Sequence, residues 1–194
     1  MKIDFDFFKI KSKLAPQKGR IIISEPFLPG NFFSRSTVLL VDYSINGAVG
    51  FILNKPLENQ IKELLNIVPG YSPEVYVGGP VSDDSLFYVH TLGEKISGSI
   101  HIKDELYWGG DFDDLKLAIV TGMARPYQVR FFVGYSGWSP GQLDNEITEN
   151  SWLVADADSK LIMTSDRNFW TESVKNAGGH YETWLNFPED PKSN

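Results

Sequence analysis

Apolar residues gather along this chain in short runs that are rich in valine and isoleucine and are separated by glycine, proline and asparagine. Such runs predict β-strands, because β-branched side chains suit a pleated, half-buried surface. The strongest pair covers 37–43 and 48–54, with Asn46-Gly47 between them as a hairpin turn of type I′. Further strands are expected at 19–24, 75–77, 85–92, 128–135, 151–155 and 160–164.

Other stretches follow the helical period. Four apolar residues recur at the i, i+4, i+7 and i+8 positions of 57–66, which predicts a short amphipathic helix there. Asp111 opens a second helix, where acidic side chains suit the positive end of the helix dipole, and Arg125-Pro126 ends it. A last helix is expected over 166–177, with Gly178 as its stop.

The stretch 133–152 predicts a strand, a glycine-bent corner and a helix. Ser139 is expected to cap the helix, with Pro140 at its first position and Gln142 completing a capping box. Trp138 and Leu143 have the spacing of a hydrophobic staple.

The elements do not alternate as strands and helices of a doubly wound sheet. Residues 93–110 are mixed, with an irregular strand suggested by isoleucines, and an Asp-rich turn precedes 160–164. The sequence therefore predicts an α+β fold. We expect a single compact domain over 19–186, with a mixed, mostly antiparallel, bent sheet or partly open barrel and about four helices. Residues 1–18 form an N-terminal extension and 187–194 a C-terminal tail.

Composition narrows the classes of function. The chain has 194 residues, is 42% hydrophobic, and contains no cysteine, which excludes disulfides, thiolate catalysis and cysteine-ligated metals. Its net charge of −7 disfavours a broad nucleic-acid-binding face, so direct DNA binding is not expected. Without a signal peptide or an apolar stretch long enough to span a membrane, the protein is expected to be soluble and cytoplasmic. The basic residues of 9–20 suggest an arm that packs on its own domain or on a neighbouring subunit, or that docks to an acidic partner.

Motifs for common chemistries are missing. The three histidines show no metal-binding spacing, and no phosphate loop or GxGxxG motif occurs, so neither a metal nor a cofactor is expected. Gly134-Tyr135-Ser136-Gly137 is placed like the nucleophile elbow of a hydrolase, but Trp138 stands where that motif needs glycine. A hydrolase or transferase that uses His90 with Ser136 or Glu146 remains the alternative to a binding protein.

Several motifs together resemble the YqgE/AlgH family of bacterial proteins. They are a Gly47–Pro56 segment (GAVGFILNKP), a Val77–Val81 segment (VGGPV) and above all Gly134–Glu146 (GYSGWSPGQLDNE), with His90 and Trp152. The resemblance implies a compact α+β domain on a bent or partly open β structure. It implies no established enzymatic activity, and a proposed link of some members to transcriptional regulation.

These observations favour a non-catalytic module that binds a partner protein or a small ligand, with a role in transcriptional regulation as a further hypothesis. Whether it forms a homo-oligomer is left open. Polar side chains and glycines at strand ends suggest the binding surface, since such elements converge at the ends of strands. The candidate surface comprises Asn54, Gly78, Gly79, Pro80, His90, Gly134, Ser136, Gly137, Trp138, Gln142 and Glu146.

Overall fold

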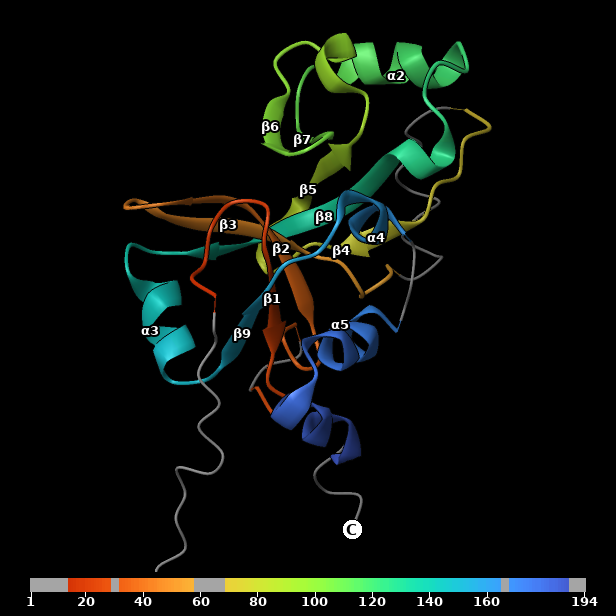
Figure 1. The fold of residues 1–194 in the computed structure, drawn as a ribbon. Helices are drawn as coiled ribbons and strands as arrows, with labels where there is room; N and C mark the ends of the chain where they lie inside the picture. Colours follow the sequence, from red (N-terminus) through yellow and green to blue (C-terminus); the bar gives the residue numbers. More distant parts are fainter. Residues whose placement is uncertain (1–13, 29–31, 58–68, 165–167, 189–194) are drawn as a thin grey trace, which may run out of the picture.

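Strand β8 (Val129–Trp138) joins the two halves of one open sheet. In the computed structural model, which describes residues 14–28, 32–57, 69–164 and 168–188, its first half pairs with β5 (Val81–His90) and, in parallel, with β4 (Val75–Val77). Its second half pairs antiparallel with β3 (Gly47–Ile52). The strand order is β6-β7-β5-β8-β3-β2-β1-β9, with β4 beside β8 (Figure 1). The predicted α+β domain with a mixed, mostly antiparallel sheet is therefore confirmed.

The other strands are β1 (Ile21–Ser24), β2 (Thr37–Ser44), β6 (Ile100–Lys103), β7 (Leu106–Trp108) and β9 (Trp152–Ala155). The α-helices in the described part of the chain are α2 (Phe112–Val120), α3 (Gln142–Thr148), α4 (Ser159–Met163) and α5 (Phe169–Ala177). Short 3₁₀ helices are η3 (Gly93–Lys95), η4 (Pro126–Gln128) and the longer η5 (Gly179–Asn186), which follows α5 directly.

The predicted hairpin is present as β2 and β3, in antiparallel register. Ser44 pairs with Gly47, so the two loop residues are Ile45 and Asn46, one position earlier than the Asn46-Gly47 turn that the sequence suggested. A bulge between Leu40 and Asp42 shifts the register and adds local twist.

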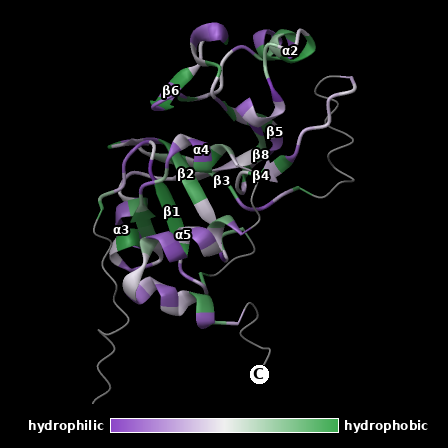
Figure 2. Ribbon diagram, turned by 45° about the vertical axis from the view of Figure 1, so that its right-hand side comes forward, coloured by the Kyte–Doolittle hydropathy of each residue, from purple (hydrophilic) through white to green (hydrophobic). Residues whose placement is uncertain are grey.

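The buried parts of the central strands are mostly apolar on both faces, because helices cover both faces of this part of the sheet. Ile21, Ile23 and their neighbours pack against the tryptophan and valine of α5, whereas Ile22 packs toward α3 and Leu143. Successive side chains of a strand point to opposite faces, which explains why three consecutive isoleucines of β1 are buried and only its last residue, Ser24, is polar. Figure 2 shows these strands as hydrophobic ribbon between the helices.

A second part of the sheet carries α2 together with β6 and β7, and forms a lobe beyond β5 (Figure 1). Leu115 and Ala118 of α2 join a core with Phe131 of β8. As expected, Asp111 caps α2, and its side chain accepts from the N–H groups of Asp113 and Asp114.

Three local predictions need correction or lie outside the described residues. The predicted strand 160–164 is wrong: α4 occupies Ser159–Met163, because the Asp158 carboxylate accepts from the Leu161 N–H and starts a helix. Helix α2 ends at Val120, before the expected Arg125-Pro126. The helix predicted at 57–66 falls almost entirely on residues that the structure does not describe.

The helix start at the corner also differs from its prediction. α3 begins at Gln142, and its N-cap is Gly141, whose φ of 73° favours glycine. Ser139 and Pro140 therefore precede the helix. Half of the expected capping box is present, since the Gln142 side chain accepts from the Ser139 N–H at 3.0 Å.

Candidate functional site

The corner between β8 and α3 is held by one carboxylate. Glu146 Oε2 accepts from the indole Nε1 of Trp138 at 2.9 Å and of Trp152 at 2.8 Å. Its Oε1 accepts from Gln142 Nε2 at 2.9 Å. The two buried indole rings lie edge to face, with centroids 5.9 Å apart. Glu146 thus joins the end of β8, helix α3 and the start of β9.

A second bond fixes α3 to the hairpin. The Tyr43 hydroxyl donates to Asp144 Oδ1 at 2.7 Å. This hydrogen bond to a carboxylate, with a smaller contribution from burial, raises the pKa of Tyr43 to about 12. The phenol therefore stays protonated and able to donate at neutral pH.

The two glycine motifs of the predicted surface pack directly on each other. Gly78 N donates to Val133 O, and a Cβ added to Gly79 would lie 2.3 Å from the carbonyl of Tyr135. The fully buried Ser136 donates its hydroxyl to Gly78 O at 3.0 Å. These glycines are therefore required for close approach of the strands, and the serine hydroxyl takes part in the same contact.

Asn54 lies near this contact, and the oxygen and the nitrogen of its side-chain amide each form a hydrogen bond with the backbone. Its Oδ1 accepts from Thr37 N at 2.9 Å and its Nδ2 donates to Arg35 O at 2.8 Å. The end of β3 reaches Gly78 through the bond from Ile52 N to Gly78 O. Asn54 is thus placed near the glycine contact, and its amide joins β3 to the segment before β2.

His90 is fully buried at the other end of β5. Its Nδ1 accepts from Leu92 N at 3.2 Å, so in the neutral ring the proton lies on Nε2, which is 3.0 Å from Ser99 Oγ and 3.2 Å from Gly109 O. Burial lowers the pKa of His90, and the bond to Gly109 opposes part of that effect. The imidazole therefore serves as a neutral bridge within the fold.

The register of β5 against β8 places His90 far from Ser136, the serine of the alternative catalytic pair. His90 pairs with Val129, seven residues before Ser136 on β8, which corresponds to about 23 Å at the usual rise of a strand. Direct proton transfer needs heavy atoms within about 3 Å. Glu146 lies on α3, which follows the end of β8 that is farther from His90.

The structure thus brings together Asn54, the Gly78–Pro80 turn and Gly134–Gly137, with the Trp138–Glu146 corner next along β8. His90 is set apart. The side chains of this predicted surface that are described above bond within the fold. As a binding surface it stays a prediction.

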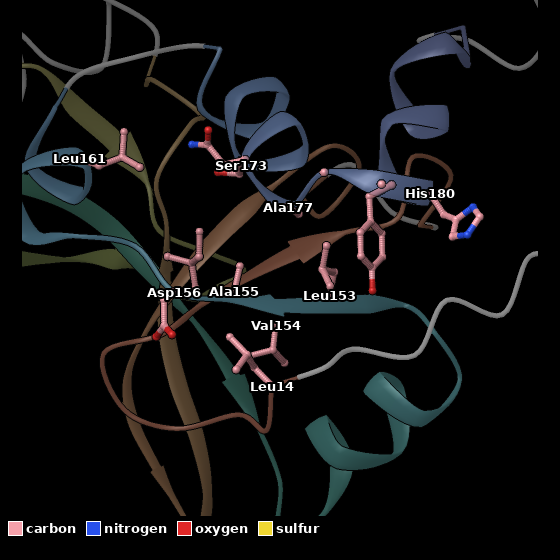
Figure 3. Close-up of a pocket in the computed structure, with 14 residues that line it drawn as sticks. Leu14, Leu153, Val154, Ala155, Asp156, Leu161, Ser173, Ala177 and His180 are labelled. Atoms are coloured by element: carbon pink, nitrogen blue, oxygen red, sulfur yellow. The ribbon is translucent and has the colours of Figure 1, made fainter.

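A cavity of about 500 Å³ lies elsewhere, between β9 and the α5–η5 unit (Figure 3). The sequence reasoning missed it, although Ser173 and Ala177 give a signal, as two small residues one turn apart on the inward face of a helix. The cavity is lined by Leu14, Ile21, Leu153, Val154, Ala155, Asp156, Leu161, Ser173, Asn176, Ala177, Gly178, Gly179, His180 and Tyr181.

Most of the cavity lining is apolar, and two of its polar residues, Asn176 and His180, are exposed to solvent. The Ser173 hydroxyl is buried and has no hydrogen-bond partner in the described part of the chain. Asp156 lies toward the outside and accepts from Arg20 Nε at 3.2 Å. Burial raises the pKa of Tyr181, so its phenol is neutral across the physiological range. The cavity is therefore mostly apolar, and its lining includes the buried Ser173 hydroxyl, which has no partner among the described residues.

Arg130 is a second feature that the sequence reasoning did not single out. This buried cation donates from Nη1 to Ile162 O at 2.5 Å and from Nη2 to Leu53 O at 2.6 Å, and lies over the Tyr76 ring at 4.3 Å. Burial lowers the pKa of Arg130. Its two carbonyl contacts join α4 to the end of β3, which is a structural role.

The described residues also lack two other kinds of feature. No group of three histidine, aspartate or glutamate side chains is arranged there to hold a metal ion. None of the helices in these residues combines the length and the apolar character that crossing a bilayer requires.

Comparison with known proteins gives consistent matches along the whole chain. Residues 21–182 match the family model described as AlgH-like, DUF179. The chain is 42% identical over 198 residues to a UPF0301 protein of Bacteroides thetaiotaomicron, with all of both chains covered. It is 41% identical over 179 residues to a UPF0301 protein of Cytophaga hutchinsonii, covering 91% of this chain and 98% of the relative.

Solved structures share the fold at lower identity. A crystal structure of a Corynebacterium diphtheriae protein matches with a TM-score of 0.72 at 21% identity, over 96% of this chain and all of that one. The solution structure of the AlgH protein from Pseudomonas aeruginosa matches with a TM-score of 0.68 at 24% identity, over 91% and 98%. At these identities the likeness concerns the fold alone.

Proposed function

Because the chain belongs to the AlgH-like family (DUF179), a family of uncharacterised proteins, and contains a preformed apolar cavity, we propose that it is a non-catalytic module that binds a small, mostly apolar ligand. The ligand occupies the space between β9 and α5–η5. The observation that carries this proposal is the cavity itself, with its size and its lining.

The size supports a small molecule. Ligand pockets measure roughly 300–1,000 Å³ and combine apolar walls with a few polar groups, and this cavity has about 500 Å³. Its walls come from Leu153, Leu161 and Ala177 on three different elements (Figure 3). Each Å² of apolar ligand surface buried there contributes about 25 cal/mol, so a ligand can bind without any charged contact.

The polar groups that were candidates for catalysis form hydrogen bonds within the fold instead. Ser136 donates to a backbone carbonyl, and His90 is buried as a neutral bridge on a distant part of the sheet. Neither group is placed to activate the other. These contacts therefore support ligand binding without catalysis.

A role in transcriptional regulation is the finer part of this proposal. It would depend on the ligand and act through a partner protein, since a net charge of −7 disfavours direct contact with DNA phosphates. A gel-shift assay with duplex DNA at low salt tests this part. We expect no shift, and a shift that weakens steeply with salt would contradict it.

The binding proposal is tested by fluorescence titration of the full chain with the uncharged dye Nile red and by native mass spectrometry of freshly purified protein. The substitution Ala177→Trp fills the cavity, and Lys175→Trp adds the same side chain at an exposed position of the same helix. We expect the dye signal, and any co-purified small molecule, to be lost with Ala177→Trp and kept with Lys175→Trp.

Equal dye binding by the two variants would overturn the proposal, provided that circular dichroism shows both folded. If Ala177→Trp does not fold, Ala177→Leu gives a smaller filling change for the same comparison. The mass spectrum also reports the subunit count, and hence whether copies of the chain associate.

A further inference from the structure

We infer that the ligand presents an uncharged hydrogen-bonding oxygen to the hydroxyl of Ser173; this inference rests on the proposed function and specifies its ligand. The evidence is the chemistry of the cavity wall. Among the described residues that line it, Ser173 has a buried hydroxyl without a hydrogen-bond partner, next to apolar side chains.

Ser173 lies on the buried face of α5 and lines the cavity (Figure 3). Only 3% of the residue is exposed, and its Oγ contacts no hydrogen-bonding atom in the part of the chain that the structure describes. A buried hydroxyl without a partner costs about 1–3 kcal/mol, so a partner supplied by a ligand is favourable. A hydroxyl both donates and accepts, and either an alcohol or a carbonyl oxygen can satisfy it.

The groups around Ser173 do not suit a charged ligand atom. Ile21, Leu153 and Leu161 are apolar, and among the described residues no lysine or arginine lines the cavity. The histidine in the lining, His180, is exposed to solvent. The lining carboxylate, Asp156, has 57% of its side chain exposed and is already paired with Arg20. Moving an unpaired charge into such a space carries a desolvation cost of several kcal/mol. The part of the ligand that reaches Ser173 is therefore neutral.

Three rigid probes of similar size separate the possible ligand classes: naphthalene, 2-naphthol and 2-naphthoate. They provide an apolar ring alone, the same ring with a neutral hydroxyl, and the same ring with a carboxylate. Dissociation constants are measured at neutral pH with the full chain, by fluorescence or calorimetry. We expect 2-naphthol to bind roughly five- to tenfold more tightly than naphthalene, as one net hydrogen bond allows, and 2-naphthoate to bind most weakly.

The variant Ser173→Ala tests the residue. It should abolish the preference for 2-naphthol and leave the affinity for naphthalene unchanged. Ser36→Ala is the matched control, because Ser36 is also a fully buried serine but its hydroxyl donates to Phe32 O, outside the cavity. This control should keep the preference of the unmodified chain.

The outcomes distinguish the inference from the proposal beneath it. If 2-naphthoate binds most tightly, or if Ser173→Ala leaves the preference for 2-naphthol intact, the inference is wrong while ligand binding stands. The second result would mean that the hydroxyl turns to the carbonyl four residues earlier in α5, as helical serines can. If none of the probes binds and the dye titration also fails, both are overturned.

Discussion

The indole nitrogens of Trp138 and Trp152 donate to the same oxygen of one carboxylate, Oε2 of Glu146, at 2.9 and 2.8 Å. The two tryptophans lie on β8 and β9, strands that are not neighbours in the sheet. A single acidic side chain on α3 thus joins distant parts of the sheet on one face.

Replacing this carboxylate should destabilise the fold. Glu146→Ala leaves two buried indole N–H groups without their acceptor, and we expect it to lower the free energy of unfolding by roughly 2–4 kcal/mol. Urea unfolding followed by tryptophan fluorescence measures the change. Glu149→Ala, at the exposed end of the same helix, should have a much smaller effect. Equal effects of the two substitutions would contradict the role given to Glu146.

The close contact of the glycine motifs predicts different tolerance to alanine. A Cβ at Gly79, with φ of 155°, would lie 2.3 Å from backbone atoms of Tyr135, whereas a Cβ at Gly70, with φ of 78°, meets nothing within 4 Å. Gly79→Ala must therefore displace β8, and Gly70→Ala suffers only local backbone strain of roughly 1 kcal/mol. We expect the melting temperature of Gly79→Ala to lie well below that of Gly70→Ala, or Gly79→Ala to yield no soluble protein. Similar melting temperatures would mean that the strands separate easily here.

Acid should weaken the fold through His90. Burial lowers its pKa in the folded protein below the ordinary value of 6.5, so the unfolded chain binds more protons between the two pKa values. The stability that His90 contributes is therefore present above about pH 6.5 and is lost as the pH falls toward the folded-state pKa. Urea midpoints at pH 7.5 and 5.5 measure the loss. His90→Gln should make it smaller, because glutamine does not titrate, and an unchanged pH dependence would contradict this assignment.

The buried Arg130 predicts that lysine is a poor replacement. A lysine ammonium cannot reproduce the planar contacts to two carbonyls and the stacking over Tyr76. We expect Arg130→Lys to lower the free energy of unfolding by roughly 2–4 kcal/mol, since buried hydrogen bonds to a charged group are lost. Arg125→Lys, at an exposed position, is the control in the same urea titration. If the two variants are equally stable, the guanidinium contacts contribute little.

Local elements were predictable where the signal lies in neighbouring residues. The β2–β3 hairpin, the Asp111 cap of α2 and the end of α5 at Gly178 are all found. The strand predicted at 160–164 was wrong because its apolar residues suit a strand or a helix equally. The Asp158 cap decides in favour of helix α4. The hairpin loop moved by one residue because the pairing of Ser44 with Gly47 sets the register.

The candidate site was predictable only in part. The corner with Trp138, Gln142 and Glu146 could be located because its helix signals lie within a few residues of each other. The cavity could not, since its lining joins Ile21 with Leu153 and Ser173, which lie far apart in the chain. A serine and an alanine on the inward face of a helix become a cavity wall only when the opposite strand leaves space beside them.

The sequence by itself determined the fold class, most strands, the start of α2, the end of α5 and the family resemblance, because alternation, helical period and capping act between residues that are close in the chain. Tertiary structure alone decided how these elements meet. It buried His90 as a neutral bridge, gave Glu146 two tryptophan donors, and left the Ser173 hydroxyl facing an apolar cavity. Contacts of this kind depend on strand order and packing across the whole chain, which no local pattern encodes.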